Sequence, residues 1–183
     1  MTQNPYMKNI FPKPPLIAYK RPPNIRDKLI RAKIPPPPPI RPKRNIVGMH
    51  KCNKPCSICP YIKEQKEVKA KFSDTKIQLS KSFDCNTQNV VYIIECKKCG
   101  DQYIGQTGRE TIRKRFLEHF GYAQRNENKS TGIHFNLPGH SITDMTISVL
   151  EQVNQNNRLY REARESYLIE KFNLKYKGMN RKK

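Results

Sequence analysis

The chain has 183 residues, which is room for one ordinary domain with extensions. It carries 36 Lys and Arg against 15 Asp and Glu, and this net charge of +21 attracts polyanions, so nucleic acid is the first partner to expect. The sequence shows neither a run of about 18 apolar residues nor a secretory signal, so we expect a soluble nuclear or cytoplasmic protein without a membrane partner.

Residues 1–44 are dominated by proline and positive charge. They contain 12 of the 15 prolines and eleven Lys and Arg, with Asp27 as the one acid. Such a segment cannot bury enough apolar surface to offset chain entropy, so we interpret it as a tail or linker. The alternative for its proline run, residues 35–39, is a docking site for a polyproline-binding partner. The basic cluster at residues 41–44 is typical of a short nuclear import signal.

Residues 45–88 are interpreted as a cysteine-rich linker that forms a zinc knuckle. Three thiols within eight residues, followed by a fourth further on, suit tetrahedral zinc. The expected ligands are Cys52, Cys56, Cys59 and Cys85. His50 is the spare ligand if Cys85 lies too far away. The alternative is that these cysteines are small buried hydrophobic residues or oxidation-prone thiols.

The next segment predicts a β-hairpin followed by a helix. Two runs rich in β-branched and aromatic residues, 90–96 and 102–107, are separated by a turn-length loop. Thr107 and Glu110 have the spacing of a capping box, so we expect a helix from Arg109 to about Tyr122.

Cys96 and Cys99 lie in the expected hairpin turn, and His134 and His140 follow the expected helix. A Cys-x-x-Cys redox motif opens a helix, whereas this one joins two strands, so a metal is favoured. We expect these four residues to bind a second zinc ion that ties the hairpin to the following loop. The alternative leaves both histidines as ordinary loop residues.

Two helical faces carry polar residues where a core is expected. Ile112, Arg115, Phe116 and His119 share one face of the helix, which indicates that this face borders a cleft, unless Arg115 only covers the core with its stem. After a third strand at residues 145–153, a helix from Arg158 to Phe172 is expected. In this helix Glu165 begins an apolar stripe, and a buried carboxylate needs a partner, either a divalent cation or Arg115.

These residues, taken in order, resemble the GIY-YIG nuclease family. The matching positions are Val90-Val91-Tyr92, with valine in place of the family's glycine, Tyr103-Ile104-Gly105, Arg115, His119, Glu165 and Asn180. The resemblance covers residues 88–181 and implies an α/β (α+β) fold, with a small three-stranded, mostly antiparallel sheet flanked by helices. We therefore expect residues 89–183 to form a nuclease-like domain.

The resemblance also implies an endonuclease that nicks DNA with Mg²⁺ or Mn²⁺ bound at Glu165. Tyr92 would take a proton from the attacking water, Tyr103 would orient that water or a phosphate oxygen, and Arg115 would neutralise charge on the phosphate. His119 would position these groups or accept the proton, and Asn180 would fix the active-site loop. Because a phenol with a pKa near ~10 is a weak base, the cation and Arg115 must lower the pKa of Tyr92.

The cysteine and histidine pattern is similar to the nuclease end of Penelope-like retroelements, where this domain follows a reverse transcriptase. This similarity implies that the chain is either a fragment of such an element or a gene derived from one, with the reverse transcriptase as a partner. The alternative function is a catalytically inactive, zinc-stapled module that binds nucleic acid.

Overall fold

The structure is a computed structural model that describes residues 47–52, 54–153 and 157–180, together with Tyr19, Lys20, Pro22 and Ile25. The chain divides into two units, residues 1–42 and 43–183. The expected proline-rich tail and its basic cluster lie almost wholly outside the described residues, so the roles expected for them stay predictions. The expected domain boundaries at residues 44 and 88 also stay predictions.

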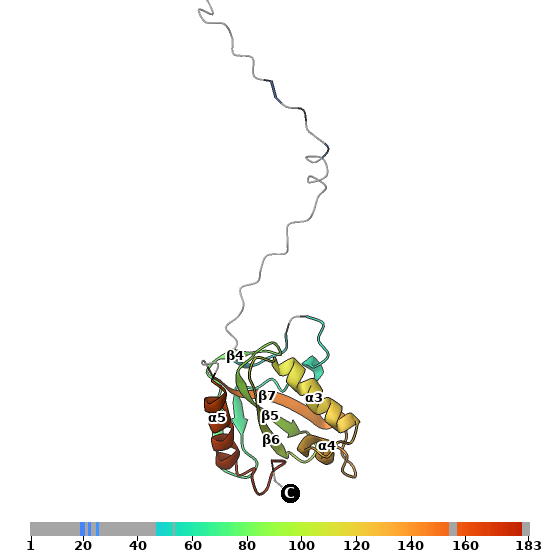
Figure 1. The fold of residues 1–183 in the computed structure, drawn as a ribbon, viewed down its shortest axis with the longest axis vertical. Helices are drawn as coiled ribbons and strands as arrows, with labels where there is room; N and C mark the ends of the chain where they lie inside the picture. Colours follow the sequence, from blue (N-terminus) through green and yellow to red (C-terminus); the bar gives the residue numbers. More distant parts are fainter. Residues whose placement is uncertain are drawn as a thin grey trace, which may run out of the picture. The chain divides into compact units, whose positions relative to one another are not determined.

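A three-stranded antiparallel sheet forms the centre of the second unit (Figure 1). Its strands are β5 (Val90–Cys96), β6 (Gln102–Thr107) and β7 (Met145–Gln152), in the order β6-β5-β7. All seven residues of β5 are buried, as expected of a central strand that is rich in Val and Ile. The predicted hairpin, the third strand and the fold class are confirmed.

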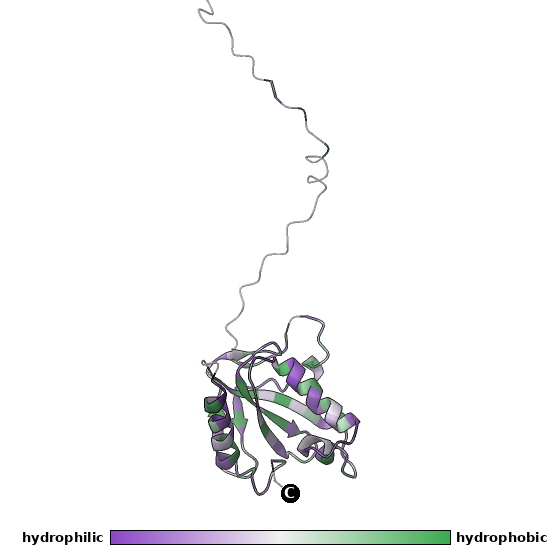
Figure 2. Ribbon diagram, in the orientation of Figure 1, coloured by the Kyte–Doolittle hydropathy of each residue, from purple (hydrophilic) through white to green (hydrophobic). Residues whose placement is uncertain are grey.

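Helices α3 (Ile112–Gln124) and α5 (Arg158–Lys171) flank the sheet (Figure 1). In Figure 2 both helices carry hydrophilic and hydrophobic residues, as expected of helices with one face in the core. The predicted helix beginning at Arg158 is confirmed, and its observed end lies one residue before the expected one. Among the described residues, no helix combines the length and the apolar character that crossing a bilayer requires.

The predicted capping box at Thr107 and Glu110 is wrong. Strand β6 continues through Thr107, whose hydroxyl donates to the Glu110 carbonyl at 3.0 Å. Helix α3 instead begins after Thr111, whose side chain accepts a hydrogen bond from the Lys114 amide at 3.3 Å. Thr107 has the capping-box glutamate three residues later and Thr111 does not, but strand β6 includes Thr107, so the helix begins after Thr111.

The short helix α4 (Ser130–Phe135) was not expected from the sequence and lies where a loop was predicted. Six residues are fewer than two turns, too few for an apolar period to be visible in the sequence. His134 therefore lies on a helix rather than in a loop.

Residues 47–88 contribute short elements to the same core. These are β1 (Gly48–Met49), η1 (Cys59–Tyr61), β2 (Glu67–Lys69), β3 (Lys76–Gln78) and β4 (Ser82–Phe83); η2 (Ile142–Asp144) precedes β7. Strand β1 pairs with β4 and β2 with β3, while Ile62 forms a β-bridge to Ile147 of β7. Buried Ile58 and Phe83 belong to one hydrophobic cluster with the central strands. The segment expected to be a linker is therefore packed into the domain.

Two arginines of helix α5 form hydrogen bonds to the sheet. Arg161, which is 6 % exposed, donates to Gln106 of β6 at 3.1 Å, and Arg164 makes two 2.7 Å bonds to Glu151 of β7. Paired bonds between a guanidinium and a carboxylate fix both distance and orientation. These contacts set the rotation of α5 about its axis and therefore the direction of Glu165, the residue after Arg164.

The end of the described chain runs along the free edge of β6. Asn180 accepts a hydrogen bond from the Ile104 amide and donates one to the Ile104 carbonyl, both at 2.8 Å. The Met179 amide donates to the Gln102 carbonyl at 3.0 Å. Asn180 is thus hydrogen-bonded to Ile104, which lies between Tyr103 and Gly105 on strand β6. From the sequence we expected it to fix the active-site loop.

Because Asn180→Ala removes both bonds to Ile104, we expect it to lower the free energy of unfolding by about 2 kcal/mol. Urea denaturation measures this change. Lys177→Ala, an exposed position in the same segment, serves as the control and should have little effect. Equal midpoints for the two variants would contradict the role assigned to Asn180.

Candidate active site

Tyr92 lies at the middle of β5, opposite Gly105 of β6. Its side chain is fully buried, and a Cβ atom on Gly105 would lie 2.5 Å from the Tyr92 hydroxyl oxygen. Residue 105 must therefore be glycine for the phenol to lie against the neighbouring strand. A register shift between β5 and β7 falls between Val91 and Tyr92, and such irregularities redirect side chains locally.

Helix α3 brings two polar side chains onto the Tyr92 hydroxyl. Arg115 Nε donates to the Tyr92 hydroxyl oxygen at 3.0 Å, and His119 Nε2 lies 2.7 Å from the same oxygen. Ile112 and Phe116, on the same helical face, are fully buried. The face of α3 on which the sequence places Arg115 and His119 therefore packs against the sheet. Both polar side chains contact the Tyr92 hydroxyl.

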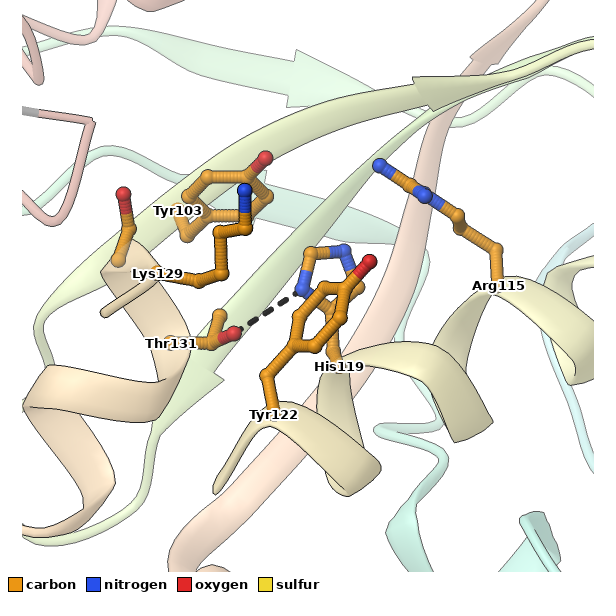
Figure 3. A pocket seen from close by; sticks show the side chains of 7 residues that line it. Tyr103, Arg115, His119, Tyr122, Lys129 and Thr131 are labelled. Carbon is orange, nitrogen blue, oxygen red and sulfur yellow. Dashed lines mark hydrogen bonds between the residues drawn. The ribbon is translucent and has the colours of Figure 1, made fainter. Parts of the chain in front are cut away.

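A cavity of about 180 Å³ opens beside this cluster (Figure 3). Its lining residues are Tyr103, Arg115, His119, Tyr122, Lys129, Ser130 and Thr131. In Figure 3 the ring of Tyr122 lies beside the His119 imidazole, and a dashed line joins this imidazole to Thr131. The cavity is lined mostly by hydrogen-bond donors and cations, which suits an anionic group such as a phosphate.

Four of these lining residues were not expected. Tyr122 follows His119 by three residues on the same helix, so helical spacing offered a signal that could have identified it. Lys129, Ser130 and Thr131 lie at the start of α4, and without that helix no sequence pattern connects them to the site.

Glu165 of α5 belongs to the same electrostatic cluster. It is half-buried, and within the described part of the chain its carboxylate makes no hydrogen bond or ion pair. Burial raises its pKa, while the positive charge of Arg115 opposes the shift. Burial raises the pKa of both Tyr92 and Tyr103, and the Glu165 charge adds to each shift. An acid, a guanidinium, an imidazole and two phenols are thus brought within electrostatic reach of one another.

Burial determines the protonation states of Tyr92 and His119. Burial raises the pKa of Tyr92 well above its usual value, with Tyr103 and Glu165 adding to the shift, and Arg115 opposes this shift without overcoming it. Burial and the nearby Arg115 charge lower the pKa of His119 to about 3. Tyr92 is therefore a neutral phenol and His119 a neutral imidazole at pH 7. Arg115 acts on the pKa of Tyr92 in the expected direction, but burial has the larger effect.

The cysteines of the knuckle converge on one point. Cys52, Cys56, Cys59 and Cys85 are free thiols, and their sulfur atoms lie within 4.8 Å of one another. The Cys52–Cys59 and Cys56–Cys85 sulfur pairs are 3.4 and 3.6 Å apart, close to the ~3.8 Å that tetrahedral Zn–S bonds of ~2.3 Å imply. The group can therefore hold a metal ion, with Cys85 rather than His50 as its fourth member.

The second expected group also converges, with all its ligand atoms within 4.8 Å. It consists of Cys96, Cys99, His134 and His140. Cys99 Sγ and His134 Nε2 are 3.5 Å apart. His140 Nε2 is buried and finds no hydrogen-bond partner among the described residues. A buried ring nitrogen without a partner is costly, and a metal ion would satisfy it.

Comparison with known proteins gives one match. The family model of the GIY-YIG catalytic domain matches residues 88–180, which is just over half of the chain and contains both tyrosine motifs, Arg115, His119, Glu165 and Asn180. No curated protein and no solved structure matches significantly.

Replacing Gly105 by alanine should displace Tyr92, because the added methyl group would meet its hydroxyl and ring carbon at 2.5 and 2.7 Å. We expect a loss of about 1–3 kcal/mol of stability, measured by urea denaturation. The matched control is Gly121→Ala in α3, where the nearest atoms belong to the flexible end of Arg125. This control should be neutral or slightly stabilising. A stable Gly105→Ala variant would contradict the close packing described above.

His119 should make the protein acid-sensitive. Its pKa falls from 6.5 to about 3 on folding, so between these values the unfolded chain binds the extra proton and stability is lost as the pH drops below 6.5. Between about pH 7.5 and about pH 5, the wild type should lose about 2 kcal/mol more than His119→Gln. Urea denaturation at both pH values measures this difference, and parallel losses in the two proteins would argue against a neutral, buried His119.

Proposed function

Since the chain belongs to the GIY-YIG family, we propose that it is a divalent-metal-dependent endonuclease that hydrolyses phosphodiester bonds and nicks DNA. The observation that carries this proposal is the contact of Arg115 and His119 with the Tyr92 hydroxyl, beside a polar cavity and within electrostatic reach of Glu165. The net charge of +21 supplies attraction for the phosphate backbone without reading its bases.

In the proposed reaction, protons move along a relay. The attacking water gives a proton to the Tyr92 hydroxyl oxygen while the proton already on that oxygen passes to His119 Nε2, 2.7 Å away. The raised pKa of Tyr92 favours such a relay over a stable phenolate. Burial is the main cause of the low His119 pKa, and the Arg115 charge lowers it further. A phosphate bound beside Arg115 offsets the second effect, which makes the imidazole a better base when substrate is present.

Arg115 and Tyr103 face the cavity where the phosphate would bind. The Arg115 guanidinium balances negative charge that grows on the phosphate in the transition state. The Tyr103 hydroxyl orients either the attacking water or a non-bridging oxygen of the phosphate. Lys129, on the rim of the same cavity, adds a further positive charge for the strand to contact.

Glu165 is proposed to hold Mg²⁺ or Mn²⁺. A half-buried carboxylate without a hydrogen-bond partner among the described residues is a hard oxygen ligand of the kind these ions prefer. When bound, the cation supplies Lewis-acid polarisation of a phosphate oxygen and stabilises the leaving group.

Both cysteine-containing groups are proposed to hold Zn²⁺ as structural staples. The first group would tie the knuckle to Cys85, ahead of the central sheet, and the second would tie the hairpin turn to α4. Sets of four Cys and His ligands suit closed, structural zinc sites. Such links add stability to a small domain whose core is limited.

Origin and partners are inferred from the same residues. The placement of Cys96 and Cys99 between the two tyrosine motifs, with His134 and His140 beyond α3, supports descent from a Penelope-like retroelement. The reverse transcriptase of that element is then the proposed protein partner, a polyproline-binding domain is a second one, and the nucleus is the proposed location.

The alternative function, an inactive module that binds nucleic acid, is favoured by one observation: the Tyr92 side chain is fully buried, and its hydroxyl is hydrogen-bonded to Arg115 and His119. Activity measurements decide between this module and the nuclease.

In a plasmid nicking assay with Mg²⁺, the wild type should be active, and Tyr92→Phe and Glu165→Ala should each lose at least about hundredfold because they remove the relay and the cation ligand. Tyr160→Phe, an exposed tyrosine on α5, should match the wild type. Equal nicking by all four proteins would eliminate the proposed site. A wild type that binds DNA without nicking it would establish the alternative function.

Elemental analysis of the purified chain should find two zinc ions, one for each group. Cys56→Ala and His140→Ala should each lose one ion, because four-coordinate sites rarely keep their metal with three ligands. A wild-type chain without zinc would refute both proposed zinc sites.

A further inference from the structure

Thr131 is a buried residue beside the cluster that none of the family motifs includes. It lies on α4, is 1 % exposed, and its hydroxyl oxygen is 3.1 Å from His119 Nδ1 (Figure 3). The other ring nitrogen, Nε2, contacts the Tyr92 hydroxyl. His119 is thus held from both sides, by a phenol of the sheet and a hydroxyl of α4.

The direction of these hydrogen bonds follows from the Tyr92 hydroxyl group. Arg115 Nε can only donate, so the phenol oxygen accepts from it. Among the described residues, the remaining partner of this buried hydroxyl is His119, so the phenolic proton must point at Nε2. Nε2 is then an acceptor. Because burial and Arg115 keep the imidazole neutral, with a pKa of about 3, its single proton lies on Nδ1 and is donated to Thr131.

We propose that Thr131 is a positioning residue that accepts the Nδ1 hydrogen of His119 and so, together with Tyr92, stabilises the Nδ1-protonated tautomer, leaving Nε2 free to accept the Tyr92 proton. This inference rests on the proposed relay for its consequence in catalysis, but the tautomer itself is a property of the protein without substrate. A histidine that carried its proton on Nε2 could not accept another one there, so the wrong tautomer would block the relay.

Contacts between α4 and α3 place the Thr131 hydroxyl accurately. A Cβ atom on Gly132 would lie 2.3 Å from the Glu127 carbonyl oxygen, in the loop before α4, and 2.9 Å from that of Tyr122 in α3, so α4 packs closely against the backbone of both. Asn136 Nδ2 donates to the carbonyls of Ala123 and Gly132, both at 2.8 Å. A helix of six residues is unstable alone, and these contacts keep it in place.

Removing the hydroxyl should mix the tautomers. In Thr131→Val, the Nδ1-protonated form leaves the Nδ1 hydrogen unpaired, whereas the Nε2-protonated form leaves the Tyr92 hydrogen and the Nδ1 lone pair unpaired. In the wild type the Nδ1-protonated form leaves none of these groups unpaired, so its advantage is smaller in the variant and both tautomers become populated. Thr131→Ser keeps the hydroxyl and should behave as the wild type, and Thr146→Val is the control for removing a different buried, hydrogen-bonded threonine hydroxyl, on β7.

Nitrogen NMR of histidine-labelled full-length protein measures the tautomer directly, with the His119 signals assigned by their loss in His119→Gln. The wild type, Thr131→Ser and Thr146→Val should show Nδ1 protonated, and Thr131→Val should show a mixture. In the nicking assay, Thr131→Val should lose about tenfold or more while Thr131→Ser retains activity.

Nε2 protonation in the wild type, or unchanged His119 signals in Thr131→Val, would overturn the proposal. So would a Thr131→Ser variant as altered as Thr131→Val, since the hydroxyl would then not be the cause. If the wild type proves inactive on DNA, the nuclease function fails while the NMR result still decides the role of Thr131.

Discussion

The Tyr92 hydroxyl is the point on which the rest of this structure depends. It accepts a hydrogen bond from Arg115, contacts His119, and fits only because residue 105 on the next strand has no side chain. Strand pairing fixes the phenol opposite Gly105, and helical spacing fixes the two partners one turn apart on α3. A change in either element would separate groups that must stay within hydrogen-bond distance.

Burial controls the chemistry of this cluster. In water, a tyrosine and a histidine keep their ordinary pKa values, but here burial raises the pKa of Tyr92 and lowers that of His119 to about 3. Both groups are therefore neutral, and a neutral pair can pass a proton along a hydrogen bond without leaving an isolated charge in the core. Arg115, which forms an ion pair with Glu118, and Glu165 are the charged groups beside this neutral pair.

Short elements hold this arrangement in place. Helix α4 carries Thr131, which contacts His119, and His134 one turn later, which belongs to the second group of candidate metal ligands. Metal binding at that group would therefore stabilise the helix that positions the imidazole. On the other side, Asn180 binds the edge of β6 between Tyr103 and Gly105. One contact holds a residue that lines the cavity, and the other holds the strand that carries Tyr103.

The sequence by itself determined the order and type of the long elements, because β-branched runs and apolar spacing at 100° per residue are local properties. It also indicated the face of α3 that carries Arg115 and His119, and the cysteines and histidines that converge. It could not choose Thr111 over Thr107 as the helix cap, nor find α4. Only the tertiary structure decided the protonation of Tyr92 and His119 and the place of Thr131, because burial and contacts between distant segments depend on how the whole chain packs.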